Sequence, residues 1–157
     1  MKGLSVVGVA VLALTLVSQS AVAADLPAGG LTRQEVADWL GRHSLTPTIH
    51  NDSEGRSIVS SAVSGVNFDI YFLDCAGDRC AAIQYAAGWT PLAGGTPDHV
   101  NQWNRDHRNI RAYLDSHNNV FGEYDIDISP GGSWEQMDQG LNRWSNAVAA
   151  FKTFFVG

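Results

Sequence analysis

Cys75 and Cys80 are the only two cysteines of the 157-residue chain, and the turn-forming residues Ala-Gly-Asp-Arg lie between them. Cysteines that flank a tight hairpin turn are close enough to form a disulfide bond. The four intervening residues do not match the C-x-x-C spacing of thioredoxin-type redox sites. Two thiols without a second pair of ligands also do not complete a tetrahedral metal site. The spacing therefore favours a structural disulfide between Cys75 and Cys80 over redox catalysis.

A second group of reactive side chains combines carboxylates and arginines. Glu123, Asp125 and Asp127 alternate along the chain, so a strand would place them on one face. Like charges this close must be solvated, paired or bound to a metal. The alternatives are ion pairing with preceding arginines, a cation site or an acidic-peptide groove. We expect an ion-pair or binding cluster formed by Arg105, Arg108, Arg111, Asp115, Glu123, Asp125 and Asp127, with Arg105 and Arg108 on one helix face.

Histidines and nucleophile motifs do not indicate catalysis. Metal-binding histidines on a helix are typically three or four residues apart, whereas His99 and His107 are eight apart and the others lie on different predicted elements. We expect His107 to be a partly buried, hydrogen-bonded residue on an apolar helix face. The chain has neither a G-x-S-x-G nucleophile motif nor a phosphate-binding glycine loop. We therefore expect no catalytic residues, no enzymatic activity, no metal site and no cofactor.

The start of the chain has the pattern of a secretory signal peptide. Met1 and Lys2 precede a mostly apolar run from residue 4 to 17, and Ala21-Val22-Ala23 supplies an A-x-A cleavage signal. The run is shorter than the roughly 20 apolar residues of a membrane helix. We expect residues 1–23 to be removed and residues 24–30 to form a mobile tail. A single domain over residues 31–157 would then be periplasmic or secreted, without a stable membrane anchor.

Composition limits the classes of partner. Lys and Arg total 10 against 16 Asp and Glu, which gives a formal net charge of -6. Such an acidic chain is a poor candidate for nucleic-acid binding, because phosphate contacts require Lys and Arg. Hydrophobic residues make up 45% of the sequence, enough for a packed core rather than a disordered chain.

The hydrophobic pattern predicts an α+β domain in the order helix, four strands, helix, two strands, helix. Capping signals at Thr32, Thr96 and Ser133 mark the helix starts. Two-residue alternation predicts strands over 46–51, 57–63, 66–73, 81–87, 110–115 and 123–128. Short connections between the first four indicate an antiparallel meander. The last helix carries an apolar stripe that should cover the sheet: Met137, Leu141, Trp144, Val148, Phe151 and Phe155.

Three segments together resemble the YbjN domain family. They are Phe68-Asp69-Ile70-Tyr71-Phe72 leading to Cys75, Ile83-Gln84-Tyr85 after Cys80, and Trp103-Asn104-Arg105 running into Arg111-Ala112-Tyr113-Leu114-Asp115. The resemblance covers about residues 31–155. It implies a fold similar to type III secretion chaperones, a curved antiparallel sheet packed by helices, and a label as bacterial sensory transduction regulators. It implies no active site. Secretion chaperones act in the cytoplasm, whereas this chain has the pattern of an exported protein.

These observations predict a non-enzymatic exported domain that binds a protein or peptide partner, with a role in envelope regulation. The alternative is a small-molecule or cation-binding periplasmic module, and a hydrolase with an unrecognised site ranks third. A partner-binding domain should present an exposed apolar patch or an unpaired sheet edge. A ligand-binding module should instead enclose a pocket with convergent polar groups.

Overall fold

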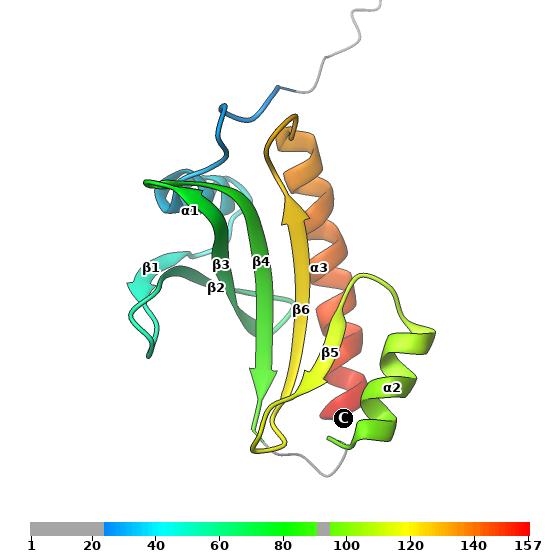
Figure 1. Cartoon of the computed structure of the whole chain (residues 1–157). Coiled ribbons are helices and arrows are strands. Elements are labelled where there is room, and N and C mark those ends of the chain that lie inside the picture. Colours follow the sequence, from blue (N-terminus) through cyan, green and yellow to red (C-terminus); the bar gives the residue numbers. More distant parts are fainter. Residues whose placement is uncertain (1–23, 91–94) are drawn as a thin grey trace, which may run out of the picture.

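The computed structural model describes residues 24–90 and 95–157 (Figure 1). The predicted signal peptide and its cleavage site after Ala23 lie outside the described residues. The described elements are α1 (Arg33–Arg42), β1 (Thr48–Asn51), β2 (Ser57–Val63), β3 (Val66–Ala76), β4 (Arg79–Trp89), α2 (Pro97–Asp106), β5 (Arg111–Leu114), β6 (Val120–Asp127) and α3 (Trp134–Phe155). This order confirms the predicted α+β class.

The six strands form one antiparallel sheet in the order β1-β2-β3-β4-β6-β5. The predicted meander of the first four strands is confirmed. The chain then passes through α2, β5 returns as the edge strand, and β6 inserts between β5 and β4. β3 and β4 extend beyond the predicted ranges, because their hairpin continues to the cross-strand pair Cys75 and Cys80.

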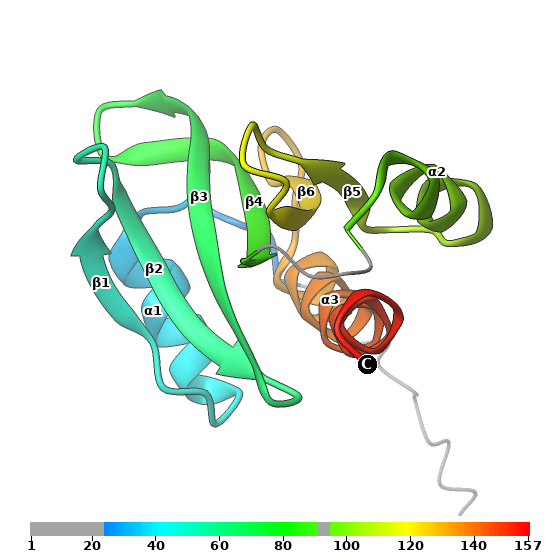
Figure 2. The same cartoon turned by 90° about the horizontal axis from the view of Figure 1, so that it is seen from below.

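The helices α1 and α3 cover one face of the sheet, and α2 lies beside the edge strand β5 (Figure 2). The predicted apolar stripe of α3 is entirely buried. One core joins all three helices to the sheet and contains the fully buried side chains of Trp39, Trp103 and Trp144. Trp144 stacks on Tyr85 of β4 with ring centroids 5.5 Å apart. Large aromatic side chains therefore supply much of the apolar area that stabilises the fold.

Two glycines allow the elements to approach closely on this covered face. A Cβ on Gly140 of α3 would overlap the side chain of Ile126 on β6. A Cβ on Gly122 would lie 2.9 Å from Ile110 and 3.0 Å from Phe151. The packing of α3 against β6 therefore depends on glycine at these positions.

The capping signals predict the helix starts correctly but differ in detail. Thr32 and Glu35 form a complete capping box at α1. At α3, the Ser133 hydroxyl accepts from the Gln136 backbone N–H at 3.2 Å, but the Gln136 side chain donates to the Asp127 carbonyl at 2.9 Å. The capping signal at Ser133 therefore forms only half of a capping box, and Gln136 instead ties α3 to the end of β6.

Residues 24–30, which we expected to be a mobile tail, are attached to the domain. The Leu26 N–H donates to the Gly132 carbonyl at 2.9 Å, and the Trp134 N–H donates to the Ala24 carbonyl at 3.1 Å. Leu26 is buried in the core. Gly30 has a φ of +94°, and a Cβ there would overlap the Cys80 carbonyl. Backbone pairing and burial of one leucine hold a segment whose small residues had suggested a free tail.

Among the described residues, no helix combines the length and the apolar character that crossing a bilayer requires.

Candidate functional site

The sheet face opposite α1 and α3 carries a row of polar and aromatic side chains. Two-residue alternation places Asp69 and Tyr71 of β3 on this face, and the antiparallel register sets them opposite Ala86 and Gln84 of β4. The same register pairs Gln84 with Asp125 of β6. No helix of the described chain covers these side chains, so we call this surface the open face.

A groove of about 660 Å³ crosses the open face. Its lining includes Tyr71, Gln84, Tyr113, Phe121 and Glu123 from the four strands β3, β4, β5 and β6. The segment between β1 and β2 also contributes to the lining, with Asp52, Glu54 and Arg56. The sheet therefore supplies a preformed recess whose side chains come from distant parts of the sequence.

Glu123 is the centre of a hydrogen-bonded network in the groove. The Tyr113 hydroxyl donates to Glu123 Oε1 at 2.9 Å, and Arg111 donates to the other oxygen. Gln84 Nε2 lies 3.4 Å from Glu123 Oε2 and 2.8 Å from Asp125 Oδ1. These bonds link three neighbouring strands, so they fix the positions of side chains around the groove.

Two tyrosines of the groove resist ionisation. Burial, together with the hydrogen bond to Glu123 and the charge of that carboxylate, raises the pKa of Tyr113 to about 12. Burial and the nearby Asp69 carboxylate raise the pKa of Tyr71, although Arg56 opposes this. Both hydroxyls are therefore neutral hydrogen-bonding groups near neutral pH.

Aromatic rings form part of the groove wall. Tyr113 and Phe121 stack with centroids 5.3 Å apart and an interplanar angle of 14°. The Phe121 ring lies over Gly88, where a Cβ would overlap it. The Arg56 guanidinium lies 4.8 Å from the centre of the Tyr71 ring, and that of Arg111 lies 5.7 Å from the Tyr113 ring. The rings of this face thus already pack against cations of the chain itself.

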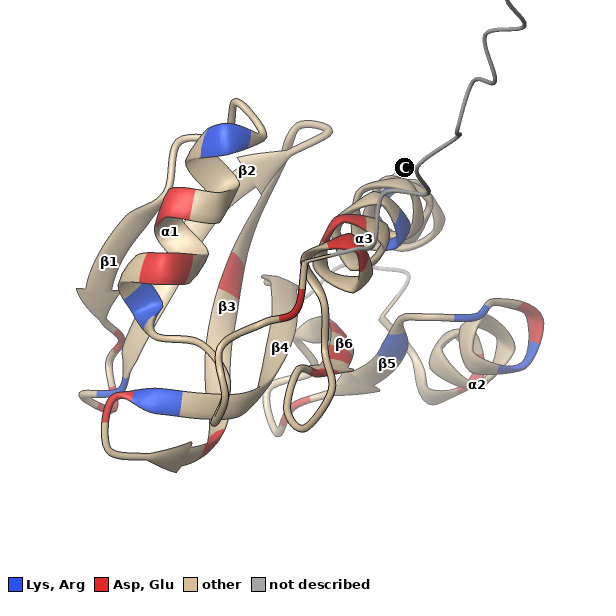
Figure 3. Ribbon diagram, turned by 90° about the horizontal axis from the view of Figure 1, so that it is seen from above, with Lys and Arg blue, Asp and Glu red and all other residues tan. Residues whose placement is uncertain are grey.

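The groove lining is acidic, with two arginines and five carboxylates: Arg33, Arg56, Asp52, Glu54, Asp69, Asp115 and Glu123. Figure 3 shows acidic residues on β3 and β6 and a basic residue on β5. Arg56 pairs with Asp52 at 2.7 Å and Glu54 at 3.4 Å. Asp69 accepts a hydrogen bond from the Ser60 hydroxyl, and no cation of the described chain forms an ion pair with it. The carboxylate of this lining residue is therefore left without an ion-pair partner among the described residues.

The structure brings together only part of the predicted charged cluster. Arg111 forms an ion pair with Glu123. Arg105 instead pairs with its neighbour Asp106 at 2.8 Å. The prediction that Arg105 and Arg108 share a helix face is wrong, because α2 ends at Asp106 and Arg108 lies beyond it.

The remaining carboxylates of the predicted cluster have separate environments. Asp115 accepts backbone hydrogen bonds from His117 and Asn119, both at 2.8 Å, and so closes the turn between β5 and β6. Asp125 accepts from Gln84, and Asp127 is exposed. The three alternating carboxylates do share the open face, as predicted, but each has a different set of partners.

His107 also differs from its predicted environment. Its ring is exposed and stacks on Trp103, with centroids 3.8 Å apart and an interplanar angle of 6°. α2 ends just before it, so it is the C-cap rather than a residue of the apolar helix face. Within residues 24–90 and 95–157, no three His, Cys, Asp or Glu side chains gather in a metal-binding arrangement.

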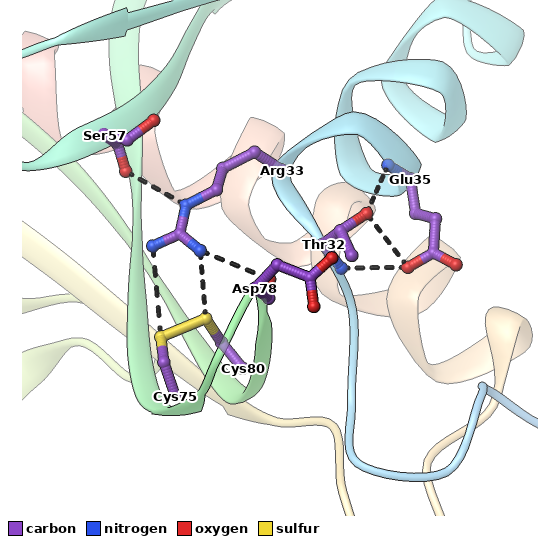
Figure 4. The surroundings of a disulfide bond; sticks show 7 residues. All are labelled: Thr32, Arg33, Glu35, Ser57, Cys75, Asp78 and Cys80. Atoms are coloured by element: carbon purple, nitrogen blue, oxygen red, sulfur yellow. Dashed lines mark hydrogen bonds between the residues drawn. A yellow bond between two sulfur atoms is a disulfide. The ribbon is translucent and has the colours of Figure 1, made fainter.

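The disulfide forms a second feature of interest, at the far end of the β3–β4 hairpin. Cys75 and Cys80 are bonded, and Cys80 is fully buried whereas Cys75 is exposed. Figure 4 shows the Arg33 guanidinium beside both sulfur atoms, with Nη1 3.4 Å from Cys80 Sγ and Nη2 4.0 Å from Cys75 Sγ. Sequence reasoning found the disulfide but missed this arginine, because it comes from the first turn of α1.

An ion pair fastens the same hairpin to α1. Arg79 donates to both carboxylate oxygens of Glu35, each at 3.0 Å, and to the Gly30 carbonyl at 2.7 Å. Burial raises the pKa of Glu35, but hydrogen bonds from Arg79 and Thr32 outweigh it, so the pKa is lower than usual. The hairpin end, the start of α1 and the preceding segment are thus held as one unit.

The sequence predicts the strands that carry the groove residues, but it does not predict the groove itself. Asp69, Tyr71 and Tyr113 lie within the predicted strands 66–73 and 110–115, but nothing in the sequence showed that β5 and β3 border the same groove. The insertion of β6 between β4 and β5 creates that arrangement.

Comparison with known proteins identifies the family. The sequence model of the YbjN family, described as "Putative bacterial sensory transduction regulator", matches residues 32–156. No match was found among curated proteins. The match spans all three helices and all six strands, so the chain belongs to the YbjN family.

Proposed function

We propose that this domain acts in the cell envelope by binding an extended, positively charged segment of a partner protein in the open-face groove. The observation that carries the proposal is the acidic, aromatic-lined groove on the sheet face that no described helix covers. The regulatory description of the YbjN family is consistent with a binding role rather than catalysis.

The charge of the groove determines the chemistry of the proposed partner. Carboxylates outnumber arginines in the lining, and Asp69 has no intramolecular cation. A guanidinium or ammonium group would complement this charge through a charge-assisted hydrogen bond. An acidic segment would be repelled from the same groove.

The aromatic walls suit the apolar side chains of such a segment. Arg56 over Tyr71 and Arg111 over Tyr113 already form cation–π contacts within the chain, so the basic groups of a partner would bind the free carboxylate instead. A partner segment with alternating basic and apolar residues would place basic groups near Asp69 and apolar groups against Phe121.

The direct test uses two synthetic peptides and a purified protein expressed from the full-length sequence. One fluorescent nonapeptide alternates Arg and Val, and the matched one alternates Glu and Val. We expect the basic peptide to bind, as measured by fluorescence anisotropy, and the acidic peptide not to bind. Binding should weaken with added salt, because partly exposed charges are screened.

Variants locate the binding site. Asp69→Asn keeps an acceptor for Ser60 but removes the charge, and should weaken binding of the basic peptide about tenfold, the effect of losing a hydrogen bond to a charged group. Asp38→Asn is the matched control, because it removes one exposed carboxylate from α1, outside the groove lining. Equal affinity for both peptides, or equal weakening by both variants, would contradict the proposal.

A small cationic ligand is the second candidate, because the carboxylate of Asp69 alone could bind one amine or guanidinium. Competition separates the two functions. If arginine amide displaces the basic nonapeptide at a concentration close to the dissociation constant of the peptide, the groove binds a small molecule. A partner segment requires the peptide to bind much more tightly than the single residue.

The proposed envelope location rests on the first 23 residues of the sequence. N-terminal sequencing of the native protein should give Ala24 as the first residue, or a residue adjacent to it. An intact Met1 in protein from the periplasmic fraction would contradict export by a cleaved signal peptide.

A further inference from the structure

The disulfide has surroundings that a purely structural bond does not require. Arg33 approaches both sulfur atoms, and its other hydrogen bonds go to the backbone carbonyls of Ser57 at 3.4 Å and Asp78 at 3.3 Å. No carboxylate of the described chain forms an ion pair with Arg33. Its positive charge is therefore directed at the sulfur atoms without a neutralising partner.

Packing holds the guanidinium in this position. Its Cζ atom lies 4.7 Å from the centre of the Phe72 ring. Arg33 is the first residue of α1, whose start is fixed by the Thr32–Glu35 capping box and by the ion pair of Glu35 with Arg79. Since Arg79 belongs to the same hairpin as Cys80, the arginine and the disulfide keep their relative placement.

The two sulfur atoms differ in access. Cys75 is exposed, whereas Cys80 has no exposed surface. An external thiolate can therefore reach the Cys75 side of the bond. A cation beside a cysteine stabilises its thiolate form and so makes that sulfur a better leaving group.

We propose that Cys75–Cys80 is a redox-active disulfide that undergoes thiol–disulfide exchange with an external dithiol, with Arg33 as the positioning residue that stabilises the thiolate released at Cys80. The proposal is independent of peptide binding in the groove. The C-x₄-C spacing alone favours a structural disulfide. The proposed reactivity arises from the charge of Arg33, which lies outside the segment between the two cysteines.

The exchange balances in two steps. A thiolate of the dithiol attacks Cys75 Sγ, a new S–S bond forms there, the Cys75–Cys80 bond breaks, and its electron pair stays on Cys80. The second thiol of the dithiol loses its proton to water and attacks the first sulfur of the dithiol, which frees Cys75 as a thiolate. Both protein thiolates can take protons from water. The dithiol is oxidised by two electrons and the protein disulfide is reduced by two.

The first test is a redox equilibrium of the full chain in glutathione buffers, with the oxidised fraction measured after acid trapping by mass spectrometry. We expect Arg33→Gln to make the disulfide harder to reduce by about tenfold in the equilibrium constant, or about 30 mV for a two-electron couple. Arg33→Lys should have a redox equilibrium constant close to that of wild type, because it keeps the positive charge. Arg42→Gln, at the other end of α1, is the matched control and should behave as wild type.

A kinetic measurement remains informative if Arg33→Gln alters folding. Wild-type protein treated briefly with glutathione and then quenched in acid should carry the mixed disulfide on Cys75. Reduction by dithiothreitol should be slower for Arg33→Gln than for wild type or Arg42→Gln. Glutathione mainly on Cys80, or equal midpoints and rates for wild type and Arg33→Gln, would overturn the proposal.

Discussion

The hydroxyl of Tyr113 donates a hydrogen bond to Glu123 Oε1 at 2.9 Å across the neighbouring strands β5 and β6. Arg111 binds the other oxygen of the same carboxylate. One carboxylate thus joins the edge strand to the groove wall and holds the Tyr113 ring against Phe121. The shape of the groove depends on this contact.

The raised pKa of Tyr113 gives a measurable signature of that contact. Ultraviolet absorbance of phenolate should show a titration with a midpoint of about 12 that is present in wild type and absent from Tyr113→Phe. Because the folded pKa is raised, the stability that this hydrogen bond contributes is present below about pH 10 and is lost as the pH rises through about 12. A wild-type minus variant titration centred near 10 would contradict both the burial of the Tyr113 hydroxyl and its hydrogen bond to Glu123, which together raise its pKa.

The Glu35–Arg79 pair predicts a dependence of stability on acid pH. The pKa of Glu35 is below its ordinary value of 4.5, so its contribution is present above that pH and is lost as the pH falls through the lower folded value. Glu35→Gln should lower the free energy of unfolding by about 1 kcal/mol near neutral pH, since the pair is partly exposed.

Urea denaturation of wild type and Glu35→Gln at neutral and acid pH measures this effect. The difference between them should shrink well below pH 4.5. Glu135→Gln is the control, because this exposed glutamate also lies in the first turn of a helix but forms no ion pair in the described structure and accepts a hydrogen bond only from Gln139. An equal difference at both pH values would mean that the charge of Glu35 contributes nothing.

Trp144 should be the most sensitive position of the long helix. Its side chain has no exposed surface and packs against both Phe68 and Tyr85. Trp144→Ala should lower the free energy of unfolding by about 3–5 kcal/mol, the range for large cavities in packed cores. A loss below about 1 kcal/mol in urea denaturation would contradict the buried role of the α3 stripe.

Local patterns predict elements well, because their causes are local. The alternation over residues 57–63 matches β2, and the capping signal at Thr32 marks the start of α1. The final helix buries every residue of its predicted stripe. In each case the burial of one face, or a contact three residues away, decides the structure.

Contacts between distant segments were not predictable in the same way. Arg33 and Cys80 are 47 residues apart, and no periodicity connects them. Arg108 was expected to continue the face of Arg105, but the helix ends between them, since the chain must turn to enter β5. The segment 24–30 was expected to be free. It is paired instead, and its partners lie near residue 132, too far along the chain for a local pattern to show. Tertiary pairing determined all three outcomes.

Binding of a basic, extended segment in the open-face groove can be observed residue by residue. Titration of isotope-labelled protein with the alternating Arg and Val nonapeptide, followed by amide chemical shifts, tests it most directly. We expect shifts concentrated on β3, β4 and β6 around Asp69, Gln84 and Glu123, and about tenfold more peptide needed to reach the same shifts in Asp69→Asn. Shifts confined to α1 and β1, or none at peptide concentrations that saturate the anisotropy signal, would contradict it.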